Sequence, residues 1–367
     1  MQSKKLKQKV NSFVMASVML VSTMLPGMSV SAAQTSNVTL DNISLQEDQI
    51  DIIVDAVVEN IEQNYAEVYA FDNYDITIHN EMEEDGMLGI DVDVLVDMTL
   101  IRNPQDSPYV LGMKAAVDEI EDATEKEFAQ QELDAYLEMI MPYYNQPVLT
   151  GFLYRVYIPM TMAMDAEGAF EFDMYHRMDI TDEEVILSEV SDNETYTEIG
   201  DAEDGREHIN EALVSPLSTT AVSYSKSDAV DYAVEHAKDV PEYSAANNNG
   251  SDCANFVSKC VNAGGIPQDS SGNWYQGSTN WIRTGYNKNG GVVPYLTGKK
   301  YFTAVSSSSS ATLGSIMYYN NKSHVAMVTL IDGSTIKYSH HSNVTKDSVY
   351  YVYNSSTDNV TFYVPQV

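Results

Sequence analysis

The distribution of charge constrains this chain more than any other feature of its sequence. Between residues 33 and 223 there are 44 aspartates and glutamates and only 6 lysines and arginines, a difference of −38. Between residues 224 and 367 each class has 10 members, a difference of zero. Four lysines near the start of the chain complete the formal net charge of −34. Two regions of such different composition predict two domains.

The boundary between the two regions falls in the polar segment 201–221, which we interpret as a linker. It separates an acidic domain at residues 33–200 from a C-terminal domain at residues 222–367, and the acidic region is long enough to bury its own core. A chain this acidic disfavours nucleic acid and anionic lipid as partners. We therefore expect the acidic domain either to bind a basic partner or to cover the active site of the other domain.

The pattern of the acidic region predicts an α+β domain. Residues 48–69 and 112–143 show the periodicity of helices. Residues 90–100 alternate strictly between apolar and polar side chains, which is typical of a half-buried antiparallel strand. Helices packed on one antiparallel sheet suggest a cystatin-like or NTF2-like fold by analogy.

Three aspartates of this alternating strand, Asp91, Asp93 and Asp97, are the candidate cation ligands of the acidic region. Strand alternation places them opposite the apolar side chains, so we expect them to face solvent rather than to hold calcium. The sequence has no zinc-ligand spacing and no phosphate-binding loop. Neither a metal site nor a cofactor is therefore predicted.

Residues 1–32 have the features of a secretory signal peptide. Four lysines precede an apolar run from Phe13 to Val30, and small residues follow it. A membrane anchor is the alternative, but the run is short and is interrupted by Pro26 and Gly27. We expect cleavage after export, which leaves a secreted, extracellular protein without a membrane segment, either free or associated with a cell wall.

The chain's two cysteines, Cys253 and Cys260, lie in the segment GSDCANFVSKC. In an exported protein two cysteines usually suggest a disulfide. Residues 254–263 read as a helix, however, in which residues seven apart are separated by about 10.5 Å, and a disulfide needs Cα atoms within about 7 Å. Cys260 lies on the apolar stripe and is expected in the core. Cys253 stands at the helix start, where the dipole stabilises a thiolate; it is a candidate nucleophile, with a buried structural cysteine as the alternative.

A thiol nucleophile needs a base, and His324 is the candidate. It begins the apolar run HVAMVTLIDG, which reads as a buried strand followed by a tight turn. The next segment, STIKYSHHSN, reads as a second strand that returns His340 or His341 to the side of His324. A cysteine at a helix start, a histidine at a strand start and a polar group on the next strand form an ordered set for nucleophilic catalysis.

Four segments of the C-terminal region carry a family resemblance: SKSDAVDYAVEHA, SDCANFVSKCVNAGG, GNWYQGSTNWIRTGY, and SHVAMVTLIDG with YSHHSN. Residues 222–367 resemble through them the putative amidase domain of many secreted Gram-positive proteins, part of the papain-like clan of NlpC-type and CHAP-type cysteine hydrolases. The resemblance implies a papain-like α+β domain in which the helix that begins at the catalytic cysteine packs on an antiparallel sheet. It also implies that Cys253 is the nucleophile and His324 the general base.

The third catalytic position depends on the face of the second strand. By period two, residues 336, 338 and 340 share one face and residues 337, 339 and 341 share the other, and the pattern alone does not decide which face meets His324. The family resemblance aligns best with His341, which is the predicted orienting residue. His340 and Asn343 are the alternatives.

Together these residues predict a secreted cysteine-dependent amidase or endopeptidase that hydrolyses an amide bond through an acyl-thioester. In this prediction Cys253 attacks the carbonyl carbon, His324 transfers the proton, and His341 orients the imidazole. The expected partner is a peptidoglycan peptide or another secreted amide substrate. One alternative is a secreted protease or acyltransferase that acts on a non-wall substrate, and the other is a non-catalytic wall-binding module.

Overall fold

The computed structural model describes most of the chain after residue 36. The described residues are 37–41, 43, 45–84, 86–160, 172–181, 184–189, 202–214, 222–243, 252–286, 290–305, 307–333, 335–342, 345–355 and 358–367. The chain divides into two units, residues 1–34 and 35–367, and every described residue belongs to the second. The predicted signal peptide and the candidate residue Asn343 lie outside the described residues.

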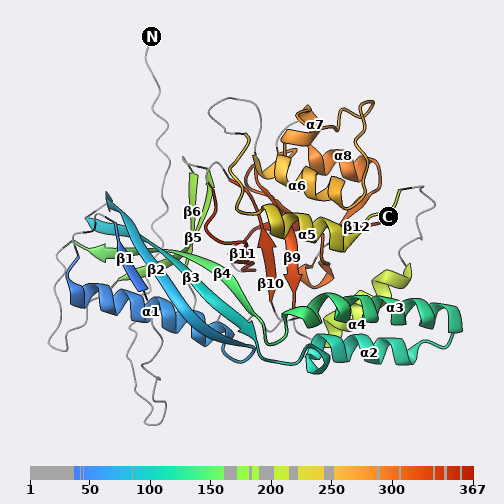
Figure 1. The fold of residues 1–367 in the computed structure, drawn as a ribbon, viewed down its shortest axis with the longest axis horizontal. Coiled ribbons are helices and arrows are strands. Elements are labelled where there is room, and N and C mark those ends of the chain that lie inside the picture. The colour runs from blue at the N-terminus through green and yellow to red at the C-terminus, as the bar shows by residue number, and fades with distance from the viewer. Residues whose placement is uncertain are drawn as a thin grey trace. The chain divides into compact units, whose positions relative to one another are not determined.

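The strands of the acidic region pair in antiparallel fashion except for β1 and β2, which are parallel, and a long helix packs along them. The helix, α1 (Glu47–Tyr65), buries Ile53, Val57 and Ile61 completely. These residues are four apart and therefore share one stripe, which belongs to the core that α1 forms with β2 and β3 (Figure 1). The strands of this region are β1 (Asn37–Leu40), β2 (Tyr69–Glu84), β3 (Met87–Leu100), β4 (Pro147–Pro159), β5 (Asp173–Thr181) and β6 (Glu184–Glu189).

The polar face of β3 differs from the prediction at Asp91, which is buried instead of facing solvent. Its two carboxylate oxygens accept hydrogen bonds from Nε and Nη2 of Arg155 at 2.7 and 3.0 Å. Arg177 pairs with Asp93. These arginines come from β4 and β5, which join the sheet beside β3 in that order. Paired guanidinium groups, and not water, therefore balance the buried carboxylate of Asp91.

The single helix predicted over residues 112–143 is two helices in the structure, α2 (Pro108–Glu119) and α3 (Ala123–Ile140). The break occurs because Asp122 caps α3. Its side chain accepts hydrogen bonds from the backbone N–H groups of Thr124 and Glu125, which no preceding helical turn can satisfy.

Much of the predicted linker is also helical. Helix α4 (Ala202–Val214) packs against α2. At Gly112 the two helices approach so closely that a Cβ atom would lie 1.8 Å from the carbonyl oxygen of Ala202. Residues 202–214 are therefore part of the packed structure.

The C-terminal region places helices over a second set of strands. Helix α6 packs on β9, and Phe256 and Val257 of the helix share a buried cluster with Val325 and Met327 of the strand. The helices are α5 (Lys226–His236), α6 (Asp252–Ala263), α7 (Thr279–Ile282) and α8 (Val292–Gly298). The strands are β7 (Phe302–Val305), β8 (Ile316–Tyr319), β9 (Val325–Ile331), β10 (Ile336–Ser339), β11 (Tyr350–Val352) and β12 (Val360–Pro365).

One mixed sheet connects the two regions. Its main path runs β1-β2-β3-β4-β11-β10-β9-β8-β12-β7, and β5 and β6 branch from β4. The connection is the parallel pair of β4 and β11, in which Tyr351 lies opposite Gly151. A Cβ atom at Gly151 would lie only 3.0 Å from the ring of Tyr351. The absence of a side chain at Gly151 therefore makes room for this ring. The α+β class is confirmed, whereas the papain-like, cystatin-like and NTF2-like assignments and the domain limits stay predictions.

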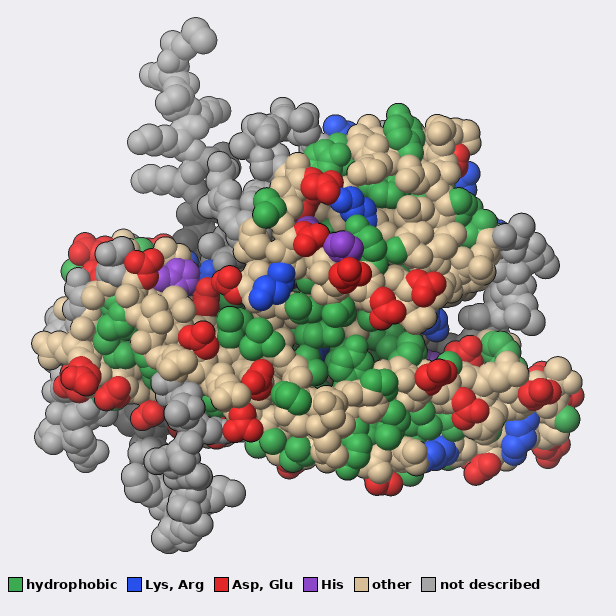
Figure 2. All heavy atoms as spheres, in the orientation of Figure 1, with side chains coloured by type: hydrophobic (Ala, Val, Ile, Leu, Met, Phe, Trp, Pro, Cys, Tyr) green, Lys and Arg blue, Asp and Glu red, His purple; other side chains and the backbone are tan. Residues whose placement is uncertain are grey.

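Acidic side chains are dispersed over the visible surface and do not gather into a single patch (Figure 2). Apolar and uncharged groups lie between many of them, which limits the repulsion that a net charge of −34 creates. Among the described residues, no helix combines the length and the apolar character needed to cross a membrane.

Candidate active site

Helix α6 places Cys253 in its first turn. The backbone N–H groups of a first helical turn have no partner within the helix, and they carry the positive end of the helix dipole. The side chain of Cys253 is 1% exposed and lies in the same buried cluster as Val325 and Met327 of β9. The predicted nucleophile is therefore a buried thiol held between a helix start and a strand.

Cys253 and Cys260 do not form a disulfide, as the helix spacing predicts. Cys260 lies about two turns further along α6 and is completely buried. Burial raises the pKa of the Cys260 thiol well above its ordinary value, which keeps this group in the unreactive thiol form. Cys260 is therefore a core residue of α6, as predicted.

The structure brings Cys253 to the segment that carries His324. The Sγ atom of Cys253 lies 3.9 Å from the backbone oxygen of Ser323, the residue directly before His324. His324 directly precedes β9 and is itself 1% exposed. Cys253, at the start of α6, thus contacts the residue that precedes His324 at the start of β9.

One ring nitrogen of His324 contacts His340, and the other has no hydrogen-bond partner among the described residues. Its Nε2 atom lies 3.1 Å from Nδ1 of His340, whereas its buried Nδ1 atom has no hydrogen-bond partner among the described residues. A buried N–H without an acceptor costs more free energy than a buried lone pair without a donor. The favoured tautomer therefore carries its proton on Nε2, donates it to His340, and presents a free lone pair at Nδ1.

Burial keeps this pair of histidines uncharged at neutral pH. Desolvation lowers the pKa of His324 to about 3, and the nearby charges of Lys346 and Lys322 act in the same direction. Desolvation also lowers the pKa of His340 well below its ordinary value. His324 is therefore a neutral acceptor of a proton in the resting protein.

His341, the predicted orienting residue, makes its contacts elsewhere. Its Nδ1 atom lies 2.6 Å from Oδ2 of Asp252, and its Nε2 atom lies 2.8 Å from the backbone oxygen of His236. The ring also stacks on Phe256 at 4.3 Å between centroids. With both nitrogens engaged, His341 does not contact His324, and the alternative residue His340 occupies the position beside it.

The physical reason lies in the alternation of β10. Ile336 and Tyr338 precede His340 on the same face of the strand, and both are buried. The ring of Tyr338 lies 5.5 Å from that of His340, which in turn lies 5.0 Å from that of His324. The face of β10 that carries Ile336 and Tyr338 thus turns His340 toward His324.

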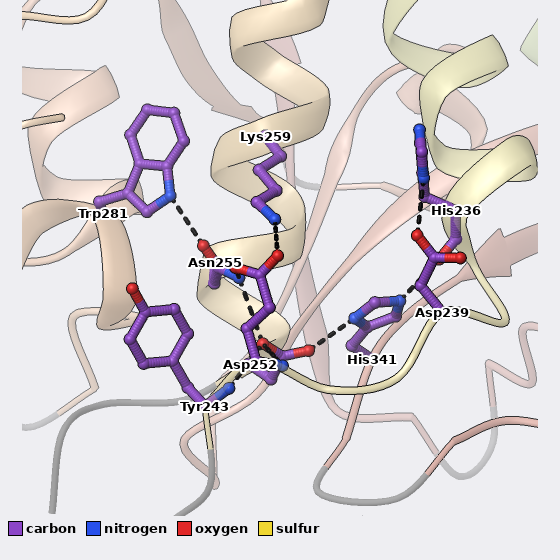
Figure 3. Close-up of polar contacts among 9 residues, drawn as sticks. His236, Asp239, Tyr243, Asp252, Asn255, Lys259, Trp281 and His341 are labelled. Carbon is purple, nitrogen blue, oxygen red and sulfur yellow. Dashed lines mark hydrogen bonds and ion pairs between the residues drawn. The ribbon is translucent and has the colours of Figure 1, made fainter. Parts of the chain in front are cut away.

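A polar network around Asp252 was not predicted from the sequence. Oδ1 of Asp252 accepts hydrogen bonds from the backbone N–H groups of Glu242 and Tyr243 and from Nδ2 of Asn255. Asn255 in turn accepts a hydrogen bond from Nε1 of Trp281 (Figure 3). The sequence signal for this network is the position of Asp252 itself, an acidic residue at the first position of a helix.

The described residues contain no group of three or more histidine, cysteine, aspartate or glutamate side chains that could hold a metal ion. The arrangement they do contain is a thiol at a helix start, a neutral imidazole whose Nδ1 is open, and a second imidazole at its Nε2. These are the kinds of group that nucleophilic catalysis by a thiol requires.

The C-terminal region is similar to a known protein family. Residues 223–366 match the model of a family described as a putative amidase domain, which confirms the resemblance carried by the four sequence segments. The description of this family points to hydrolysis of an amide bond as the class of reaction. Comparisons with curated proteins and with solved structures found no match.

Proposed function

We propose that this protein is a secreted cysteine-dependent amidase or endopeptidase that hydrolyses an amide bond of peptidoglycan peptides. Cys253 is the nucleophile, His324 the general base and His340 the orienting residue. One observation carries the proposal. His324 uses Nε2 to contact His340 and keeps Nδ1 open, and the residue directly before it contacts the Sγ atom of Cys253.

The first chemical step forms the acyl-enzyme. Nδ1 of His324 takes the thiol proton while Sγ of Cys253 bonds to the carbonyl carbon of the substrate. The carbonyl π electrons move to oxygen, and the resulting oxyanion is stabilised by backbone N–H groups at the start of α6. The C–N bond then breaks, and the departing nitrogen takes the proton from Nδ1 of His324.

The second step releases the acid product. A water molecule gives a proton to Nδ1 of His324 and bonds to the thioester carbon, and the C–S bond breaks as the carbonyl reforms. The proton returns to sulfur, so that the resting thiol and neutral imidazole are restored. Throughout both steps the hydrogen bond between Nε2 of His324 and Nδ1 of His340 holds the ring orientation and stabilises the imidazolium that forms transiently.

The substrate assignment rests on compartment and family. The N-terminal lysines and the apolar run that follows them support export, and the amidase-domain match supports cleavage of an amide bond. Cys253, His324 and His340 are at most 2% exposed, so a substrate reaches the thiol only if neighbouring segments move. We retain two roles for the acidic region as parts of the proposal: binding of a basic partner, or cover of this site.

The test is mass spectrometry of muropeptides after incubation with the purified mature chain, compared with Cys253→Ala and His324→Ala variants. The expected result is a cleaved peptide with wild-type protein and none with either variant. Lys126→Met, which changes a half-exposed side chain, is the control that should cleave normally. Wild-type turnover by His324→Ala would overturn the assignment of the base.

Assays of the same proteins with other substrates separate the alternative functions. Cleavage of secreted proteins or transfer of an acyl group to an added amine, without cleavage of muropeptides, would favour a protease or acyltransferase on a non-wall substrate. Binding to walls that Cys253→Ala leaves unchanged, without any bond cleaved, would favour the non-catalytic module.

A further inference from the structure

The residues directly beside the two candidate catalytic segments bind each other. Asp252 precedes Cys253 on α6, and His341 follows His340 after β10. Nδ1 of His341 lies 2.6 Å from Oδ2 of Asp252, and both side chains are buried. One contact thus ties the helix of the nucleophile to the strand of the orienting residue, a single position away from each.

The hydrogen-bond geometry indicates the protonation of this pair. Nε2 of His341 faces the backbone oxygen of His236 at 2.8 Å, and a carbonyl oxygen only accepts. Nδ1 faces a carboxylate oxygen, so both ring nitrogens donate when both hydrogen bonds form. Asp252 is fully supplied with donors, because its Oδ1 accepts from two backbone N–H groups and from Asn255. The geometry therefore corresponds to an imidazolium and a carboxylate, a charge-assisted contact of the strong kind.

The surroundings hold this charged pair in place. The ring of Phe256 stacks on that of His341 with an interplanar angle of 22°, which excludes water from one face and favours a cation. The contact joins four segments: the end of α5, residues 242–243, the start of α6 and the end of β10 (Figure 3). Lys259 and Glu242 form a second ion pair at the rim of the same cluster.

We propose that Asp252 and His341 are positioning residues: their buried ion pair fixes the separation between Cys253 and the His324–His340 pair. The inference rests on the proposed function for its catalytic consequence, but the ion pair itself is testable without any substrate. Because His341 is committed to Asp252, it is unable to take the orienting role that His340 fills beside His324.

The first test measures the protonation of His341 directly. In ¹⁵N-histidine-labelled full-length protein at neutral pH, the NMR spectrum should show one imidazole with protons on both nitrogens that disappears in His341→Gln and changes in Asp252→Asn. His324 and His340 should appear as neutral rings in the same spectrum, since burial lowers the pKa of both. A His341 ring protonated on only one nitrogen would overturn the inference.

The second test measures the effect on the thiol. Asp252→Asn and His341→Gln should each slow iodoacetamide labelling of Cys253 and lower kcat by about 10- to 100-fold with little change in KM, because displacement of reacting groups by about 1 Å has effects of this size. The double variant, whose amide groups can hydrogen-bond to each other, should recover part of the loss. Asp239→Asn is the matched control, since it removes an exposed aspartate–histidine contact with His236.

The outcomes separate the two claims. Strictly additive losses in the double variant, or losses that thermal unfolding of the variants accounts for in full, would overturn the positioning role. A doubly protonated His341 and slower labelling in the variants, found in a wild-type protein that cleaves no amide, would support the ion pair and overturn the proposed function alone.

Discussion

Lys337 is a buried lysine whose removal should change how stability depends on pH. It lies on β10 with 1% of its surface exposed, and its Nζ atom donates a hydrogen bond to Oγ1 of Thr150 at 3.1 Å. The same Nζ atom lies 4.8 Å from the ring centroid of Tyr69. Desolvation lowers the pKa of Lys337 from 10.5 to about 7, and the charge of Asp332 offsets part of this effect. In the folded protein about half of the Lys337 amines are therefore neutral at pH 7, and nearly all are neutral at about pH 9.

The sign and size follow from proton linkage. Between pH 7 and 10.5 the unfolded chain binds the lysine proton and the folded protein largely does not, so stability rises with pH across this window. For pKa values of 10.5 unfolded and about 7 folded, the cost of burying Lys337 is about 4 kcal/mol at pH 7 and about 1.5 kcal/mol at about pH 9.5. Wild-type stability should therefore gain about 3 kcal/mol between these two pH values from this one residue.

The variant Lys337→Met keeps an unbranched side chain of similar length and removes the charge. At pH 7 it should be as stable as the wild type or more stable, because a well-packed apolar group avoids the desolvation cost. The advantage should shrink by about 3 kcal/mol on going to about pH 9.5. Urea unfolding of both proteins at several pH values gives these differences, and titrating tyrosines cancel in the comparison.

Lys126→Met provides the matched control. The side chain of Lys126 is 43% exposed and lies 3.9 Å from a carboxylate oxygen of Asp118. Its replacement should shift stability by less than about 0.5 kcal/mol at every pH. A parallel pH dependence of wild-type and Lys337→Met stability would refute the reasoning, because it would mean that Lys337 stays charged inside the fold.

Three further predictions concern the cysteines of α6, the titration of His324, and the contact between α2 and α4. Iodoacetamide should label Cys253 of the native protein before Cys260, because burial raises the pKa of the Cys260 thiol. Equal labelling of the two in a peptide map would contradict this, and Cys260→Ala should cost only about 1 kcal/mol of stability. Burial lowers the pKa of His324 to about 3, so below pH 6.5 the imidazole becomes protonated in the unfolded chain before it does in the folded protein. This difference should lower the free energy of unfolding by about 3 kcal/mol by about pH 4.5. Urea unfolding of His324→Asn should lack that loss, and an unchanged acid dependence would refute it. Gly112→Ala should lower stability by about 1–3 kcal/mol, seen as a lower Tm, because its methyl group would overlap the carbonyl oxygen of Ala202.

The candidate nucleophile and base are predictable from sequence because local patterns define both. The helical stripe of α6 separates Cys253, at the helix start, from the core residue Cys260. The apolar run after His324 marks a strand that is buried along its whole length. Each pattern records which side of an element faces the core, and that information survives in a short segment.

The remaining features depend on partners that are distant in the sequence. Strict alternation predicts an exposed Asp91, but Arg155 and Arg177 arrive from other strands and pair with the β3 carboxylates in the sheet. The preference for His341 fails for a similar reason, since the choice between adjacent histidines depends on what Asp252 binds. Neither arginine nor Asp252 leaves a local signal in the segment that it stabilises.

Several contacts bind the acidic region to the strands that carry the site. Beside the β4–β11 pair, Oγ of Ser348 donates to the backbone oxygen of Leu149 at 3.2 Å, and the hydroxyl of Tyr136 donates to the backbone oxygen of Ile331 at 3.4 Å. Apolar residues of both regions, including those of β3, β9 and β11, belong to one buried cluster. The ring of Tyr351, which belongs to β11 of this shared sheet, lies 5.1 Å from the ring of His340.

These contacts oppose the idea that the acidic region and the C-terminal region, which differ so much in net charge, are two independently folding domains. A piece limited to residues 222–367 would lose β4, leaving β11 as an unpaired edge and exposing Tyr350 and Tyr351. Each newly exposed large side chain costs about 1.5–3 kcal/mol, and domains have only about 5–15 kcal/mol of stability in total. We therefore expect the short piece to lose cooperative unfolding and the selective labelling of Cys253 over Cys260, whereas residues 35–367 keep both.

Gly151→Val in residues 35–367 is the control that keeps both regions present and disturbs only their junction, because a Cβ atom there already approaches the ring of Tyr351 at 3.0 Å. It should lower Tm and slow Cys253 labelling while leaving the chain folded, since the displaced ring presses on His340. Circular dichroism melts and labelling rates of the three proteins decide the matter. If residues 222–367 melt cooperatively at the Tm of the longer chain and label Cys253 at the same rate, the shared sheet contributes nothing that the site needs, and the boundary predicted from charge describes two separate folding units.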